Sequence, residues 1–147
     1  MTSSKPNNSN VTTYRVIYGD TDQMGVVYYA NYLRWFERGR GELLRACEIP
    51  YATIERRGMH FPVAKLSCRY FRPAHYDDLI VIETRITSVS RASLTFTYGI
   101  TREADAMLIA SGSTKHACVD GQGKIMRIQD DLLKALEVVL SPTEKTA

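Results

Sequence analysis

The sequence lacks the features of a membrane or secreted protein. None of its 147 residues belongs to an apolar run of the roughly eighteen residues that a membrane-spanning helix needs. The first residues, MTSSKPNNSN, are polar and contain no apolar segment of the kind found in secretion signals. We therefore expect a cytoplasmic protein with no membrane span.

Cysteine and histidine are scarce and poorly spaced for binding a metal. The cysteines are odd in number, lie far apart and include no C-x-x-C pair, which argues against a disulfide framework or a zinc site. The histidines share no metal-ligand spacing. These residues are Cys47, Cys68, Cys118, His60, His75 and His116. We predict no metal site and no cofactor, and we interpret the cysteines as small core residues.

Several other functional patterns are absent. No G-x-S-x-G occurs, and there is neither a Gly-rich phosphate loop nor a Rossmann-type alternation of strands and helices. The net charge of +3 comes from 19 basic and 16 acidic residues that are spread along the chain without a basic block. We therefore expect no binding of nucleic acid or membrane surfaces, and carboxylates remain as the candidate catalytic groups.

The composition indicates one globular domain. With 44% hydrophobic residues, a chain of this length buries roughly two-thirds of its unfolded surface. We predict a disordered N-terminal tail over residues 1–10, a single domain over residues 11–141 and a C-terminal tail over residues 142–147.

A pattern of helical period follows Gly25. Apolar residues recur at spacings of three, four and seven, which predicts a long helix that ends near Cys47. Gly39 and Gly41 fall inside this helix, where each is about 1 kcal/mol less favourable than alanine. We expect that the close approach of another backbone requires these two glycines.

Most of the later sequence has the pattern of strands. From Leu94 to Ile100, large apolar residues alternate with small polar ones, and residues 79–89 are dense in Ile and Val. One long helix followed by about four long strands predicts an α+β domain, with a central helix on a mainly antiparallel sheet of five to six strands. Because one helix cannot cover both faces of such a sheet, we expect at least a homodimer, with a homotetramer as the larger assembly.

The acids with the most suggestive surroundings lie in the stretch from Tyr18 to Tyr32. Asp20 and Asp22 precede the long helix, where backbone N–H groups and the helix dipole favour negative charge. The acids alone do not decide between a catalytic role and a turn or helix-cap role. The neighbouring side chains are unusually apolar for a loop: Met24, Val26, Val27, Tyr28 and Tyr29. Asp77 and Asp78, by contrast, are typical of a structured turn.

The segment GDTDQMGVVYYANYLRWFE resembles the signature of the hotdog-fold acyl-CoA thioesterases of the 4-hydroxybenzoyl-CoA thioesterase and YbgC type. In that family, D-x-D-x-x-G-[IV]-V-x-[HY]-x-N-Y opens the central helix. The match continues through FPV from Phe61, YFRPAHYDD from Tyr70 and TKHACVD from Thr114. It extends over residues 11–127 in the same order and implies the hotdog fold.

The resemblance implies a thioesterase mechanism. The catalytic aspartate of the family is the second of D-x-D, which is Asp22, and Asp20 becomes a supporting acid and turn former. The backbone N–H of Tyr29 is then expected to face the thioester carbonyl and stabilise an oxyanion. Asp22 attacks the thioester directly or activates a water as general base, and the sequence does not separate these routes. Many YbgC-type members have histidine in place of Tyr29, whereas the hydroxybenzoyl type has tyrosine.

The resemblance also indicates contacts with an acyl-CoA substrate. Arg91, Ser93 and Arg127 match positions where family members present basic and hydroxyl groups to the phosphates of coenzyme A. Tyr28 is a candidate for the acyl pocket, and an acyl carrier protein is a further candidate partner. The sequence does not identify the acyl group.

Two other functions remain open. A hotdog dehydratase or hydratase uses other acid–base pairs, commonly with a histidine, and no evident motif here pairs a histidine with Asp22. A non-catalytic acyl-CoA or acyl-carrier binding module would retain Arg91 and Arg127 without needing Asp22.

Overall fold

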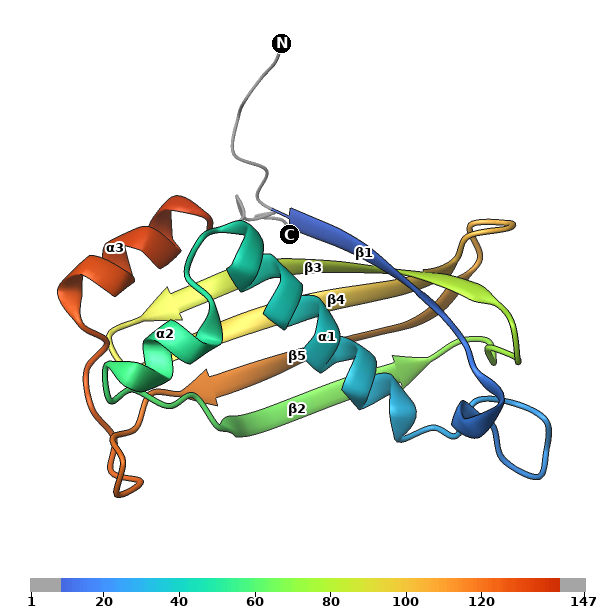
Figure 1. The fold of residues 1–147 in the computed structure, drawn as a ribbon, viewed down its shortest axis with the longest axis horizontal. Coiled ribbons are helices and arrows are strands. Elements are labelled where there is room, and N and C mark those ends of the chain that lie inside the picture. Colours follow the sequence, from blue (N-terminus) through green and yellow to red (C-terminus); the bar gives the residue numbers. More distant parts are fainter. Residues whose placement is uncertain (1–8, 141–147) are drawn as a thin grey trace, which may run out of the picture.

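The computed structural model describes residues 9–140 (Figure 1). Its elements follow one another along the chain as β1 (Ser9–Arg15), the short 3₁₀ helix η1 (Tyr18–Asp20), α1 (Asn31–Ala46), α2 (Tyr51–Arg56), β2 (Val63–Tyr70), β3 (Leu79–Ser90), β4 (Ser93–Arg102), β5 (Leu108–Ala117) and α3 (Asp130–Val138). Within these residues, no helix is long and apolar enough to cross a membrane.

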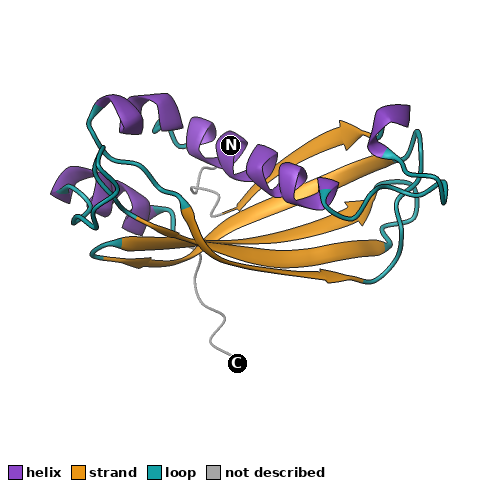
Figure 2. Ribbon diagram, turned by 90° about the horizontal axis from the view of Figure 1, so that it is seen from below, coloured by secondary structure: helices purple, strands orange, loops and turns teal. Residues whose placement is uncertain are grey.

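The five strands form one antiparallel sheet in the order β1-β3-β4-β5-β2. The long helix α1 lies across one face of this sheet, as Figure 2 shows, and packs chiefly on β1 and β3. This arrangement confirms the predicted α+β fold with one central helix on an antiparallel sheet. The strands β1 and β2 form the two edges.

The predicted boundary of the N-terminal tail was wrong by two residues. Ser9 and Asn10 belong to β1, where they lie opposite Arg85 and Thr84 of β3. A polar segment is ordered here because ladder hydrogen bonds to a neighbouring strand, rather than apolar side chains, hold it. The remaining residues of both predicted tails lie outside the described residues.

The core lies between α1 and the sheet. As predicted from their alternation, Leu94, Phe96, Tyr98 and Ile100 of β4 are all buried. The ring of Phe36 on α1 stacks on Tyr98, with 4.3 Å between the ring centres. His116 on β5 is buried as well, and this burial lowers the pKa of its imidazole, which favours the neutral ring in the core.

The glycines of α1 have different surroundings. A Cβ atom added to Gly39 would overlap the side chains of Thr84 and Ile82 on β3, so this glycine permits the helix to approach the sheet. Side chains, rather than the backbone that we expected, impose this requirement. A Cβ atom on Gly41 would meet nothing within 4 Å.

Replacing Gly39 by alanine tests this packing. We expect Gly39→Ala to lower the free energy of unfolding by about 1–3 kcal/mol, because α1 must move away from β3 to admit the methyl group. Gly99→Ala on β4 is the matched control, since its Cβ atom meets nothing within 4 Å. Urea denaturation of both variants provides the measurement, and equal stabilities would contradict this account of Gly39.

Candidate functional site

The segment between η1 and α1 forms a tight loop around Asp22. Asp22 N–H donates to the carbonyl of Val26 at 2.9 Å, and Gly25 N–H donates to the carbonyl of Asp22 at 2.9 Å. Thr21 and Val27 face each other as an isolated antiparallel bridge at the base. Gly25 has a φ of 82°, a backbone conformation that glycine adopts without strain. The sequence therefore closes this loop with local bonds.

The Asp22 carboxylate projects from this loop. Its Oδ1 atom accepts a hydrogen bond from Met24 N–H at 2.8 Å, which fixes the side chain. Asp22 is exposed, and so are the Met24 side chain (83%) and Tyr29 (62%). Only Val27 of the apolar neighbours is buried, because the loop extends beyond the sheet. In the single chain these apolar residues therefore do not enclose the carboxylate.

Asp20 has a different environment. Its Oδ2 atom accepts hydrogen bonds from the Tyr14 hydroxyl at 2.8 Å and from Ile17 N–H at 3.0 Å. Its carbonyl accepts from Tyr28 N–H at 2.9 Å and from the Asn31 side chain at 2.8 Å. Burial raises the pKa of Tyr14, and the bond to Asp20 raises it further, so the hydroxyl remains a donor. These contacts agree with the interpretation of Asp20 as a turn former.

Tyr29 lies two residues before Asn31, the first residue of α1. Its carbonyl accepts a long hydrogen bond from Tyr32 N–H at 3.4 Å, in the first turn of the helix. Among the residues that the structure describes, the Tyr29 N–H donates no hydrogen bond. A backbone donor of this kind at a helix N-terminus is suited to an anion or a developing oxyanion.

Tyr70 is a site residue that the sequence reasoning did not single out. Its hydroxyl donates to the carbonyl of Tyr29 at 3.0 Å, and its ring packs edge-on against Tyr29 and Tyr32. Burial raises the pKa of Tyr70 well above the usual tyrosine value, so the hydroxyl stays protonated. One indication of its importance was present in the sequence, because Tyr70 is the first residue of the segment YFRPAHYDD that matches the family.

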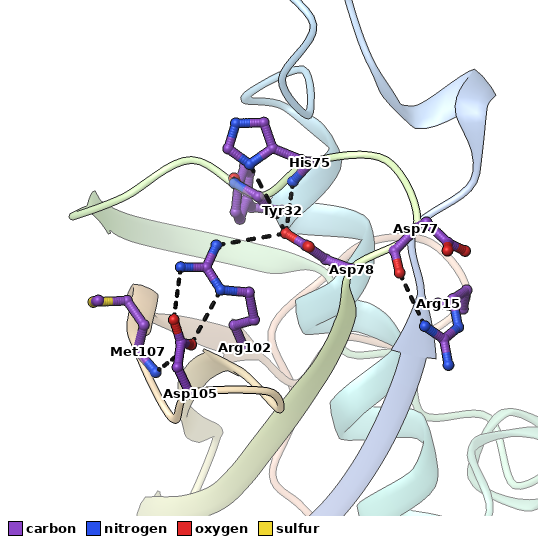
Figure 3. A network of polar contacts seen from close by, with 9 residues as sticks. Arg15, Tyr32, His75, Asp77, Asp78, Arg102, Asp105 and Met107 are labelled. Atoms are coloured by element: carbon purple, nitrogen blue, oxygen red, sulfur yellow. Dashed lines mark hydrogen bonds and ion pairs between the residues drawn. The ribbon is translucent and has the colours of Figure 1, made fainter.

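A polar network lies in the segment between β2 and β3 (Figure 3). The Asp78 carboxylate accepts a hydrogen bond from His75 N–H at 2.9 Å and pairs with Arg102 at 3.6 Å. Arg102 also binds Asp105 through two contacts of 3.1 Å, which lower the pKa of Asp105. Asp77 N–H donates to the carbonyl of Val16 at 3.0 Å, and Asp78 N–H donates to that of His75 at 3.1 Å, so the interpretation of Asp77 and Asp78 as parts of a structured turn is confirmed.

This turn connects directly to the loop that carries Asp22. Val26 forms an isolated bridge with His75, and Val27 N–H donates to the carbonyl of Ala74 at 2.9 Å. Ala74 N–H in turn donates to the hydroxyl of Tyr32 on α1 at 3.1 Å. The loop, the turn and the first part of α1 therefore form one hydrogen-bonded unit.

The residues predicted to bind coenzyme A lie together around the turn between β3 and β4, apart from the Asp22 loop. Arg91 is in the tight turn between β3 and β4, and the Ser93 hydroxyl lies 2.6 Å from that of Ser90. Ile128 N–H donates to the carbonyl of Arg91 at 2.8 Å, which brings Arg127 beside this turn. Both arginines are exposed. The structure thus brings the three predicted residues into one region.

The two groups lie at opposite ends of the sheet. β3 begins next to the turn that supports the Asp22 loop and ends at the turn that contains Arg91, as Figure 1 shows. Its 12 residues span roughly 36 Å at about 3.3 Å per residue. One chain therefore does not bring Asp22 and Arg91 together.

Within residues 9–140, no cluster of His, Cys, Asp and Glu is arranged to hold a metal ion.

A long helix on a curved five-stranded antiparallel sheet, with an acidic loop before the helix, defines a hotdog-fold domain. The family model of the thioesterase-like superfamily matches residues 16–136. The chain therefore belongs to the thioesterase-like superfamily.

Individual relatives support the same assignment. The acyl-CoA thioester hydrolase YbgC of Escherichia coli is 39% identical over 106 residues, which are 72% of this chain and 78% of that protein. A hypothetical protein of Thermus thermophilus is 35% identical with a TM-score of 0.84, over 90% of this chain and 98% of that chain. The DHNA-CoA thioesterase of Staphylococcus aureus is 29% identical with a TM-score of 0.84, over 89% and 90% of the two chains. The predicted hotdog family of the 4-hydroxybenzoyl-CoA thioesterase and YbgC type is confirmed.

The different environments of the two aspartates predict different effects on stability. We expect Asp20→Ala to lower the free energy of unfolding by about 2–3 kcal/mol, because the Tyr14 hydroxyl and Ile17 N–H lose their acceptor. Asp22→Ala removes only the acceptor for Met24 N–H and should cost less than about 1 kcal/mol. Urea denaturation measures both, and a larger loss for Asp22→Ala would show that Asp20 is not the structural acid.

Proposed function

We propose that this chain hydrolyses acyl-CoA thioesters to a free acid and coenzyme A. One observation carries the proposal. The segment that leads into α1 contains both an exposed carboxylate, that of Asp22, and a backbone N–H that donates no hydrogen bond, that of Tyr29. Both residues lie within the segment matched by the thioesterase-like family model. No metal or organic cofactor takes part in this mechanism.

The Tyr29 N–H and the dipole of α1 polarise the thioester carbonyl. As the carbonyl becomes tetrahedral, negative charge develops on its oxygen, and one oriented donor stabilises that charge by typically about 3 kcal/mol. The hydroxyl of Tyr70 and the N–H of Tyr32 both bind the Tyr29 carbonyl, which holds this residue in place. The donor is therefore positioned before the substrate arrives.

Asp22 supplies the second half of the chemistry by one of two routes. The bond from Met24 N–H occupies Oδ1 and leaves Oδ2 available. As a general base, Asp22 takes a proton from water, hydroxide adds to the carbonyl carbon, and the thiolate of coenzyme A leaves and takes up a proton. As a nucleophile, Asp22 displaces that thiolate and forms an anhydride, which water then hydrolyses to regenerate the carboxylate.

A site shared between two copies is part of the proposal. β2 is an edge strand with exposed apolar side chains, among them Leu66 and Tyr70. Antiparallel pairing of β2 with β2 of a second copy would place the Tyr70 end of one beside the Val63 end of the other. The Asp22 loop adjoins the Tyr70 end, and the Arg91 turn adjoins the Val63 end, next to the end of β5. One copy thus supplies the acid and the other the phosphate contacts.

Asp22→Asn tests the chemical step. We expect it to lower kcat for thiol release about a thousandfold, because the amide is neither a base nor a nucleophile. Tyr29→Phe is the matched control and should stay within about threefold of wild type, since the proposed donor is a backbone group. Release of free thiol from short-chain, long-chain and aryl-CoA substrates provides the measurement and also reveals the acyl preference.

The same experiment separates the alternatives. If Asp22→Asn hydrolyses as fast as wild type while Asp20→Asn is inactive, the wrong aspartate has been chosen. Binding of coenzyme A without thiol release from any substrate would favour the acyl-CoA or acyl-carrier binding module. Addition or loss of water on an enoyl or hydroxyacyl-CoA, with the thioester intact, would favour the dehydratase or hydratase. Acyl groups carried on an acyl carrier protein test that protein as an alternative substrate.

Substitution of the arginines tests the phosphate contacts. We expect Arg91→Ala and Arg127→Ala each to raise KM for an acyl-CoA about tenfold, with kcat little changed, because exposed guanidinium groups bind phosphates electrostatically. The corresponding acyl-pantetheine lacks the nucleotide phosphates, so its KM should not respond to either substitution. Steady-state kinetics at low ionic strength make the comparison, and an equal rise for both substrates would contradict the assigned role.

A further inference from the structure

Arg102, the last residue of β4, joins two segments of the chain near the Asp22 loop (Figure 3). Its Nε and Nη2 atoms donate to the two carboxylate oxygens of Asp105, each at 3.1 Å, and its Nη1 atom lies 3.6 Å from Asp78 Oδ2. Asp105 belongs to the turn between β4 and β5, and Asp78 belongs to the segment between β2 and β3. The two bonds to Asp105 orient the guanidinium, so that its remaining nitrogen faces Asp78.

The contact between Arg102 and Asp78 is the best shielded ion pair among residues 9–140. Its two side chains are 22% and 21% exposed, whereas every other ion pair includes a side chain that is at least 43% exposed. Water and salt screen a partly shielded pair less than an exposed one, so it holds its two partners more firmly. Arg102 therefore restrains the side chain of Asp78.

Asp78 transmits this restraint to the loop that carries the proposed catalytic acid. Its Oδ2 atom accepts a hydrogen bond from His75 N–H at 2.9 Å. His75 forms an isolated bridge with Val26, and the carbonyl of Val26 accepts the N–H of Asp22 at 2.9 Å. An unbroken series of contacts therefore leads from Arg102 to Asp22.

Arg102 itself touches neither of the proposed reacting groups. In the part of the chain that the structure describes, its side chain makes no hydrogen bond or ion pair with Asp22 or Tyr29. The Asp22 carboxylate accepts one hydrogen bond, from Met24 N–H in its own loop. The position of this carboxylate therefore depends on how the loop is held by the rest of the chain, and an effect of Arg102 on the reaction passes through that hold.

We propose that Arg102 is a positioning residue for thioester hydrolysis and places the Asp22 carboxylate through its ion pair with Asp78. The inference rests on the proposed function. Loss of the ion pair releases the turn and lets the loop move, and a small displacement of a reacting group can slow a reaction by up to about a hundredfold. The residues proposed to bind the phosphates lie at the opposite end of the sheet, so substrate affinity is unaffected (Figure 1).

Two substitutions remove the ion pair in different ways. Arg102→Met removes the positive charge, whereas Asp78→Asn removes the negative charge and retains an oxygen that can accept from His75 N–H. We expect each variant to lower kcat for thiol release about tenfold, with KM for the acyl-CoA within about twofold of wild type. The double variant R102M/D78N should be no slower than the slower single variant, because both changes break the same contact. Steady-state kinetics below the melting transition of every variant provide the measurement.

Three kinetic outcomes would overturn the proposal. The first is an unchanged kcat in both single variants, and the second is a rise in KM without a fall in kcat. The third is a double variant in which the two effects multiply, because Arg102 and Asp78 would then act independently.

Arg85→Met is the matched control. Arg85 is also half-buried and pairs with a carboxylate, that of Glu83, at 3.3 Å. Within residues 9–140, neither of these side chains makes a hydrogen bond or ion pair with the turn of residues 74–78. We therefore expect kcat of Arg85→Met to stay within about twofold of wild type. A fall equal to that of Arg102→Met would mean that loss of any such ion pair slows the reaction, and it would contradict the specific role of Arg102.

Amide hydrogen exchange tests the positioning without measuring catalysis. The loop amides of Asp22, Gly25 and Val27 are all hydrogen-bonded, so their exchange reports opening of the loop. In both Arg102→Met and Asp78→Asn we expect peptides that contain residues 20–28 to exchange at least about threefold faster than in wild type, while peptides around Arg91 exchange at the wild-type rate. Mass spectrometry of peptic fragments makes the comparison.

The exchange result separates this inference from the proposed function. Unchanged exchange in residues 20–28, or an equal rise along the whole chain, would overturn the positioning by Arg102. If wild type releases no thiol but the loop of the variants exchanges faster, the proposed function fails, and the restraint of the loop by Arg102 stands.

Discussion

The close contact between α1 and β3 is the constraint on which the acidic end of the molecule depends. Because Gly39 has no side chain, the helix lies directly over Thr84 and Ile82. The Thr84 hydroxyl is buried there without a hydrogen-bond partner among the described residues, which costs about 1–3 kcal/mol. Burial of the apolar side of α1 offsets that cost. Together with the hydrogen bond from Ala74 N–H to the Tyr32 hydroxyl in the first turn, this contact sets the position of α1 and thereby that of Tyr29 before it.

Asp20 and Asp22 show how surroundings assign different tasks to identical side chains. The Asp20 carboxylate is occupied by two donors, one of which comes from β1, and it serves to connect the strand to the loop. The Asp22 carboxylate has one donor from its own loop and otherwise faces outward. Asp20 is thus tied to β1 by its side chain, whereas Asp22 is free to meet a substrate, so the geometry agrees with the choice that the family pattern makes between them.

Much of the fold followed from the sequence because local patterns determine it. The alternation from Leu94 to Ile100 identified β4, and the apolar period after Gly25 identified α1, since each element buries one regular face. Ser9 and Asn10 were missed because partners on β3, rather than their own polarity, order them. Tyr70 was missed for a similar reason, because its bond to the Tyr29 carbonyl spans 41 residues. Contacts between distant segments leave no periodic signal in the sequence.

The length of β3 has a consequence for how the protein would respond to sequence variation. If Asp22 of one chain works with Arg91 of another, each pair of chains contains two reaction centres, and each chain belongs to both. A chain that lacks the acid and a chain that lacks the arginine would then complement each other, since their mixed pair retains one centre with neither defect. The separation of the two groups along a single strand would thus make the two-chain assembly, rather than the individual chain, the unit on which selection acts.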